Sequence, residues 1–223
     1  MDKKLLVIYK SKYGTTGQYA KWIAQALGAE LAEVSTVKPD SLHAYDVVIY
    51  GGGLYAGGIA GIKLVTRNPC KNLVVFTVGL ADPDATDYSA IINKNIPLEL
   101  LTKTKVFHFR GGIDYKQLGP VHKVMMAMMK NMIQKKSDSE RNAEDKEFLK
   151  TYDSQVNFSD RQTMEPLVAY VNRMGLAGGC YTSALSFAYK TEAPIAAAEQ
   201  TADLAEMLVD QAYRMTLLEL GVM

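Results

Sequence analysis

The segment Ser11-Lys12-Tyr13-Gly14-Thr15-Thr16-Gly17 decides how the rest of this chain is interpreted. It follows the apolar run Leu5–Tyr9, typical of a buried parallel strand, and precedes residues 18–27, whose apolar side chains recur at helical spacing. A helix that starts after such a turn offers unpaired N–H groups and the positive end of its dipole, and small residues let a phosphate approach the backbone. The segment therefore predicts an anion site, with a capped turn that binds nothing as the alternative.

Apolar runs further along the chain indicate the other strands of one sheet. The runs cover residues 29–34, 45–50, 72–78 and 105–109, and helical patterns at 61–67 and 84–93 lie between the later ones. Strands that alternate with helices predict right-handed βαβ units and a parallel sheet covered on both faces. We therefore expect an α/β fold.

Two of these strands lead into glycine-rich loops, at residues 51–58 and 79–83. In an open α/β sheet, ligands bind in the crevice at the carboxyl ends of the strands. Glycine in such loops permits close approach of the backbone to a ligand. The sequence therefore predicts that both loops converge with residues 11–17 on one site.

The composition excludes several classes of protein. The chain has 223 residues, 48% of them hydrophobic and 22% charged, as expected of a globular protein with one good core. A net charge of +1 argues against nucleic-acid binding, and no apolar run reaches the length of a membrane span. The two cysteines, Cys70 and Cys180, lack a metal-type spacing, and the N-terminus lacks the apolar segment of a signal peptide. We expect a cytoplasmic protein without a metal site.

Residues 11–17 and the two glycine-rich loops resemble those of flavodoxins, and the resemblance extends over about residues 3–174. It implies a doubly wound five-stranded parallel sheet of order 2-1-3-4-5 that binds flavin mononucleotide (FMN). In that family the first loop holds the FMN phosphate, and the second and third loops border the isoalloxazine ring. Carried over by position, the phosphate residues are Ser11, Lys12, Tyr13, Gly14, Thr15 and Thr16. The ring residues are Gly52, Gly53, Leu54 and Tyr55 in the second loop and Gly79, Leu80 and Ala81 in the third.

Tyr55 is the candidate for stacking on the flavin ring, with an ordinary half-buried loop residue as the alternative. The third loop lacks the aromatic residue that is typical of short electron-carrier flavodoxins. This departure from the family pattern favours a more open ring and direct chemistry on a substrate.

A closer resemblance is to the flavodoxin-domain branch that contains menaquinone-dependent protoporphyrinogen dehydrogenase. It rests on four segments, YKSKYGTT (9–16), VGLADP (78–83), FRGGIDY (109–115) and NFSDR (157–161), the last before a final helix. The resemblance implies an FMN-dependent oxidoreductase, in its sharpest form porphyrinogen oxidation with a quinone acceptor, and a quinone or a redox partner protein as partner. A simple electron carrier and a flavodoxin-like binding module without cofactor are the alternatives.

A dinucleotide-binding motif is the rival interpretation of the second loop. Gly51-x-Gly53-x-x-Ala56 after a strand matches the relaxed fingerprint. That fingerprint requires an acidic residue about 20 positions later, and residues 71–78 contain none. A dinucleotide domain would also leave residues 11–17 unexplained, so we rank it below FMN.

A long insertion, residues 111–156, separates the last strong strand from the final helix of the flavodoxin-like body. Residues 118–136 predict a helix with a broad apolar face, formed by Val121, Val124, Met125, Met128, Met129, Met132 and Ile133. Residues 116–136 carry basic but no acidic side chains, which suits a peripheral membrane contact or a quinone-bearing complex. The alternative is a helix that packs over the sheet as added core.

The flavodoxin resemblance does not cover residues 175–223. Gly175–Gly179 is interpreted as a hinge, and Pro194 near a helix start precedes apolar residues at helical spacing up to Leu218. We expect a helical extension that docks on the body, with docking on a second copy in a homodimer as the alternative.

Few residues are candidates for acid–base chemistry or substrate contacts. His108 in the last strand and His122 on the insertion helix are each interpreted first as structural residues. Arg110 could meet an anionic substrate group, and Asp82 could equally cap the next helix. We assign no catalytic residue, because a flavin carries the redox chemistry and the protein positions it.

Overall fold

The computed structural model describes residues 3–55 and 57–174. The chain divides into two compact units, residues 1–169 and 170–223. The first unit holds the sheet, and its last helix, α7 (Glu165–Arg173), runs on into the second. The expected hinge at 175–179 and the helical extension over 175–223, with Cys180, lie outside the described residues. The predicted domain boundary at residue 174 therefore stays a prediction.

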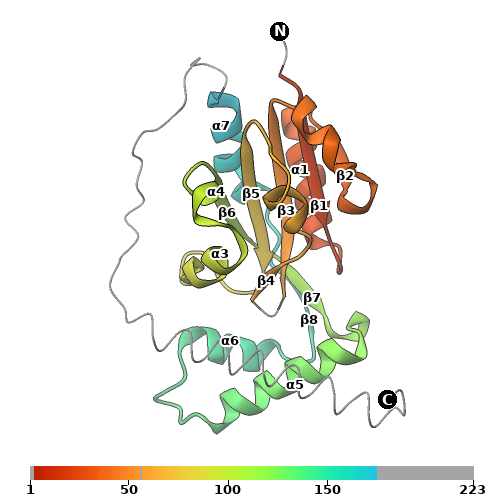
Figure 1. Ribbon diagram of the computed structural model, residues 1–223. Coiled ribbons are helices and arrows are strands. Elements are labelled where there is room, and N and C mark those ends of the chain that lie inside the picture. Colours follow the sequence, from red (N-terminus) through yellow and green to blue (C-terminus); the bar gives the residue numbers. More distant parts are fainter. Residues whose placement is uncertain (1–2, 56, 175–223) are drawn as a thin grey trace, which may run out of the picture. The chain divides into compact units, whose positions relative to one another are not determined.

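Five parallel strands form the sheet at the centre of the first unit (Figure 1). They are β1 (Leu5–Lys10), β2 (Glu30–Glu33), β3 (Val47–Tyr55), β5 (Leu73–Gly79) and β6 (Lys105–Arg110). Their order is β2-β1-β3-β5-β6, and the short strand β4 (Gly58–Ile59) pairs antiparallel with the end of β3. The predicted order 2-1-3-4-5 is confirmed, since it counts the five parallel strands without β4.

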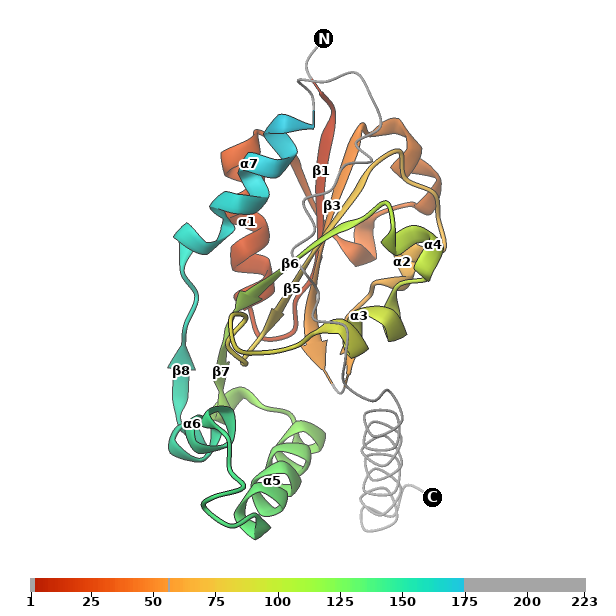
Figure 2. The ribbon, with the colours of Figure 1, turned by 90° about the vertical axis from the view of Figure 1, so that its left-hand side faces the viewer.

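Helices cover both faces of this sheet (Figure 2). On one face lies α1 (Thr15–Leu27), and on the other lie the short helices α2 (Lys63–Thr66), α3 (Ser89–Asn95) and α4 (Leu98–Leu101). The 3-10 helices are η1 (Val34–Thr36), η2 (Pro39–Ala44), η3 (Tyr115–Gln117) and η4 (Arg161–Met164). Successive side chains of a strand point to opposite faces, which gives β1 two buried sides. Leu6 and Ile8 join the apolar cluster that includes α2 and α3, and Val7 is fully buried on the other side.

The helix expected at residues 84–93 begins later, at Ser89. The segment before it is a turn, in which the Asp82 carboxylate accepts the Asp84 N–H at 3.1 Å. Asp82 therefore holds a turn, and its expected alternative role as a helix cap is not observed.

The insertion leaves and re-enters the body through two antiparallel strands. β7 (Gly112–Asp114) follows β6 directly and pairs with β8 (Gln155–Asn157). Between them lie η3, α5 (Pro120–Lys135) and α6 (Ala143–Thr151). Figures 1 and 2 show α5 and α6 at the ends of these strands that are remote from the sheet. The predicted helix at 118–136 is confirmed as α5.

Much of the apolar face of α5 is exposed. Ile133 is 4% exposed, whereas Met129 is 48% and Met132 is 57% exposed. Among the α5 side chains that the structure describes, Ile133 is the one that is buried. The alternative of added core therefore explains only part of this helix. None of the described helices is long and apolar enough to cross a membrane.

Candidate functional site

A pocket of about 260 Å³ opens at the carboxyl ends of the strands. Its walls come from the segments after β1, β5 and β6, the end of β3, and α5. The predicted site residues in its lining are Tyr13, Thr15, Thr16, Leu54, Tyr55, Gly79 and Leu80. The other predicted site residues, Ser11, Lys12, Gly14, Gly52, Gly53 and Ala81, lie outside the lining. The structure thus brings the three predicted segments together at one pocket.

The first loop presents the N-terminus of α1 to this pocket. Gly14 has a left-handed φ of 95° just before α1, and its N–H donates to Ser11 Oγ at 3.1 Å. No side chain caps α1. Within the described part of the chain, the Thr15 and Thr16 hydroxyls, which line the pocket, make no hydrogen bond. This arrangement offers the positive end of a helix dipole and two hydroxyl donors to an anion.

Lys12 and Tyr13 contact a residue of the insertion, His122. The Tyr13 hydroxyl oxygen lies 2.5 Å from His122 Nδ1, and Lys12 Nζ lies 3.4 Å from His122 Nε2. The His122 ring also stacks on Tyr55, with 5.6 Å between the ring centroids and 23° between the planes. Burial, and after it the Lys12 ammonium, lower the pKa of His122, so the imidazole is predominantly neutral at pH 7. One face of the Tyr55 ring is therefore covered by His122.

Gly52 and Gly53 are buried inside β3 rather than in an exposed loop. A Cβ on Gly52 would lie 2.5 Å from Ile59, and one on Gly53 would lie 2.8 Å from the Tyr55 ring. These glycines make room for protein side chains, and the next two residues, Leu54 and Tyr55, reach the pocket. The expectation of a loop here is wrong, because β3 continues as strand to Tyr55 and its parallel pairing with β5 reaches Gly53.

Gly79 and Leu80 border the pocket beside the end of β6. The Gly111 N–H donates to the Gly79 carbonyl at 2.7 Å. A Cβ on Gly111 would lie 2.6 Å from Val78 and 3.0 Å from Thr15 Oγ1. Glycine at position 111 thus allows β5, β6 and the start of α1 to meet at the pocket.

The contributions of the segment after β6, of β7 and of α5 to the pocket were not predicted. Together with Val78 of β5 and Leu118 just before α5, the unpredicted lining residues are Gly111, Gly112, Ile113, His122, Met125, Met126 and Met129. A signal for the first of these segments was present, because Gly111-Gly112 follows a strong strand as the other glycine-rich loops do. The α5 wall could not be predicted, because methionine spacing reveals a helix face and not what that face covers.

Arg110 ties the third loop to the insertion. Its guanidinium forms an ion pair of 2.5 Å with Glu147 of α6 and lies 3.8 Å from the centroid of the Phe158 ring. Its Nε also donates to the Leu80 carbonyl at 3.0 Å, and the Tyr19 hydroxyl donates to the Arg110 carbonyl at 2.9 Å. Glu147, Phe158 and the Leu80 carbonyl occupy the guanidinium, so the expected contact with a substrate anion has no support in the structure.

His108 packs under Tyr88 and does not line the pocket. Its Nδ1 lies 2.6 Å from Thr77 Oγ1, and its ring stacks on Tyr88 with 4.0 Å between centroids. Burial lowers the pKa of His108 to about 4. His108 is therefore a structural residue.

We expect His108 to make the protein less stable as the pH falls from 6.5 toward 4. The unfolded chain takes up a proton near the ordinary histidine pKa of about 6.5, whereas the folded protein resists protonation to about pH 4, so acid favours unfolding. Between these pH values, protonation of His108 in the unfolded chain lowers the free energy of unfolding by on the order of 1 kcal/mol per pH unit. Urea unfolding at pH 7 and pH 5 should show a smaller loss for His108→Asn than for wild type, and equal losses would contradict the assignment.

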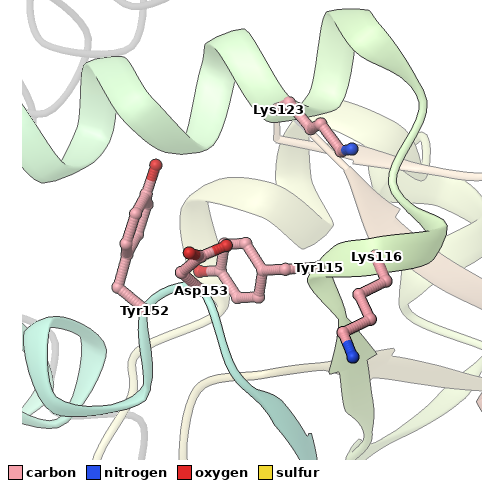
Figure 3. Close-up of a pocket in the computed structure, with 5 residues that line it drawn as sticks. All are labelled: Tyr115, Lys116, Lys123, Tyr152 and Asp153. Atoms are coloured by element: carbon pink, nitrogen blue, oxygen red, sulfur yellow. The ribbon is translucent and has the colours of Figure 1, made fainter.

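A second cavity, of about 220 Å³, lies within the insertion (Figure 3). Tyr115, Lys116, Lys123, Tyr152 and Asp153 line it. The rings of Tyr115 and Tyr152 meet edge to face at 5.1 Å between centroids. Asp153 follows the end of α6 with a left-handed φ of 62°, a conformation that aspartate adopts more readily than most residues. None of the predicted site residues lines this cavity.

Comparisons with known proteins identify the family of this chain. An uncharacterised protein of Methanocaldococcus jannaschii is 38% identical over 55 residues, 24% of this chain and 37% of that protein, so the chain spans little more than a third of this relative. A WrbA-like flavodoxin of Agrobacterium tumefaciens is 19% identical, with a TM-score of 0.34 over 48% of this chain and 83% of that one. A flavoprotein of Lactobacillus acidophilus in complex with FMN is 16% identical, with a TM-score of 0.33 over 48% and 92%. A model of the flavodoxin domain matches residues 6–140, more than half of the sequence, and the chain therefore belongs to the flavodoxin-domain family.

Proposed function

We propose that this chain binds FMN at the carboxyl edge of its sheet and acts as an FMN-dependent oxidoreductase or electron-transfer protein. The observation that carries the proposal is a largely apolar pocket that begins at the uncapped N-terminus of α1. Membership of the flavodoxin-domain family supports a flavin ligand. The described residues contain no group of three His, Cys, Asp or Glu side chains placed to hold a metal ion.

The residues at the pocket fit the two chemically different ends of FMN. The free N–H groups of α1 and the Thr15 and Thr16 hydroxyls suit an anionic phosphate, and Lys12 adds a cation to the same loop. Leu54 and Leu80 provide apolar surface for the isoalloxazine ring. When bound, FMN supplies one- and two-electron redox chemistry, and the protein positions the ring and limits its contact with water.

The wall contributed by α5 favours a small apolar redox partner over a simple electron carrier. Met125, Met126 and Met129 extend the lining beyond the sheet, and Met129 remains 48% exposed where it meets solvent. Methionine side chains adapt to partners of irregular shape. Together with the branch resemblance, this wall leads us to propose porphyrinogen oxidation with a quinone acceptor as the specific reaction.

Purification without added cofactor, followed by absorption spectroscopy and fluorescence titration with FMN and FAD, tests the cofactor. We expect a yellow protein or tight uptake of FMN. A colourless chain that takes up neither flavin would contradict the proposal and favour the cofactor-free binding module. Turnover of a porphyrinogen with a soluble quinone then tests the specific reaction, and its absence in FMN-loaded protein would favour the electron carrier.

A further inference from the structure

His122 connects the insertion helix α5 to the first loop of the sheet. It lies in the first turns of α5, and its two ring nitrogens face Tyr13 at 2.5 Å and Lys12 at 3.4 Å. Its ring stacks on Tyr55 from the end of β3. Among the described residues, the side-chain hydrogen bonds from α5 to the strand-end segments all involve His122. This single side chain therefore joins α5 to both segments.

The contacts of His122 require its neutral form. The Lys12 ammonium has only donors, so His122 Nε2 must act as the acceptor. The remaining ring proton is then on Nδ1, which donates to the Tyr13 hydroxyl oxygen. Protonation would place an N–H on Nε2 against the Lys12 ammonium, and this contact would become repulsive.

In the described part of the chain, few other polar contacts hold α5 in its position over the pocket. The pocket-lining side chains Met125, Met126 and Met129 lie one or two turns beyond His122 on α5. The insertion joins the body through β7 and β8, with the Arg110–Glu147 ion pair as a tie on α6 rather than on α5. If His122 loses its contacts with the first loop, the apolar wall that α5 contributes to the pocket is free to move.

We propose that His122 is a pH-sensitive latch that holds α5 closed over the pocket in its neutral form and releases α5 when it is protonated. The effect of the latch on ligand binding rests on the proposed function, because the pocket that α5 closes is the one proposed to hold FMN. His122 is a positioning residue here, since it acts through α5 and the first loop.

The sign and the range of the pH response follow from the groups around His122. Lys12, Tyr13 and Tyr55 face it, and burial raises the pKa of Tyr55 to about 12, so the Tyr55 hydroxyl does not titrate near neutrality. The pKa of His122 is lowered in the closed form and ordinary once it is released, so protons favour the open form. Acid therefore begins to favour the open form only below the ordinary histidine pKa of about 6.5, and it favours that form increasingly as the pH falls further.

Hydrogen exchange of the cofactor-free protein tests the latch without any flavin. After correction for the intrinsic exchange rate, we expect the amides of residues 124–130 to lose protection several-fold between pH 7.5 and pH 5.5, while the α1 amides keep theirs. His122→Phe keeps an aromatic ring beside Tyr55 but no hydrogen bond, and should show low protection of α5 at both pH values. His43→Gln, at an exposed site on η2, should behave as wild type. Protection of α5 that is independent of pH in wild type would overturn the proposal.

The rate of FMN release separates this inference from the proposed function. We expect release to be several-fold faster at pH 5.5 than at pH 7.5 in wild type, and fast at both in His122→Phe. Tyr13→Phe, which keeps the ring and removes only the hydroxyl, is a second variant and should also reduce the protection of the α5 amides at pH 7.5. If these amides are as well protected in Tyr13→Phe as in wild type, the latch is overturned. If FMN does not bind but α5 still opens with acid through His122, the proposed function fails and the latch stands.

Discussion

Replacing Thr15 with glutamate will weaken FMN binding by about 100-fold or more. Thr15 is the first residue of α1, and its hydroxyl lines the pocket without a partner among the described residues. A hydrogen bond to a charged phosphate contributes about 1.5–3 kcal/mol, and the introduced carboxylate would in addition repel that phosphate at the helix N-terminus. A loss of about 2.7 kcal/mol corresponds to a 100-fold change in affinity.

Two neutral variants separate charge from size at this position. Thr15→Gln has nearly the shape of the glutamate variant without its charge, and we expect it to bind FMN more tightly than Thr15→Glu by at least about 10-fold. Thr15→Ser keeps the hydroxyl and should bind within a few-fold of wild type. Equilibrium fluorescence titration measures all three, and urea unfolding of the cofactor-free proteins checks that each is folded. Equal affinities of Thr15→Glu and Thr15→Gln would show that no anion binds beside Thr15.

Replacing Gly51 with alanine will lower the free energy of unfolding by about 3 kcal/mol, the upper part of the usual range for overpacking a core. Gly51 pairs with Phe76 across β3 and β5, and the Phe76 ring occupies the space where a Cβ would be. Phe76 is fully buried and packs on Phe109 with 5.5 Å between centroids, while Tyr19 of α1 stacks on Phe109 from above at 4.8 Å. The ring therefore cannot move aside without disturbing the contact of α1 with the sheet.

Gly119 provides the matched control for this substitution. A Cβ at Gly119 would meet no atom within 4 Å, and its φ of −64° suits alanine, so Gly119→Ala should change stability by no more than about 1 kcal/mol. A smaller side chain at position 76 should accommodate the new methyl, so the double variant Gly51→Ala/Phe76→Leu should be more stable than the sum of the two single changes implies. If urea unfolding shows that the double variant loses the sum of the two single losses in the free energy of unfolding, the Phe76 ring is not the reason for glycine at position 51.

The sequence predicts those features of the fold that depend on periodic patterns. Apolar runs such as Leu5–Tyr9 are long enough to identify the strands, and their alternation with helices determines the parallel order. The glycines of the second loop show the limit of this reasoning. A glycine that admits a ligand and one that admits a neighbouring side chain look alike in sequence, and Gly51 and Gly52 belong to the second kind.

The candidate site is predictable where it follows from strand ends and unpredictable where it follows from tertiary contact. Thr15, Thr16, Leu54 and Leu80 line the pocket because the carboxyl ends of parallel strands lie at one edge of the sheet. His122 lies more than 100 residues from Tyr13 in sequence, and α5 belongs to the insertion that β7 and β8 connect to the body. No spacing in the chain encodes that contact.

The most direct test of the account compares FMN with riboflavin, which has the same ring and no phosphate, by equilibrium fluorescence titration of the cofactor-free protein. If the N-terminus of α1 binds the phosphate and the apolar pocket binds the ring, FMN should bind at least about 100-fold more tightly than riboflavin, a difference of about 2.7 kcal/mol. Equal affinities for the two, or binding of neither, would contradict a flavin site built on Thr15, Thr16 and the start of α1.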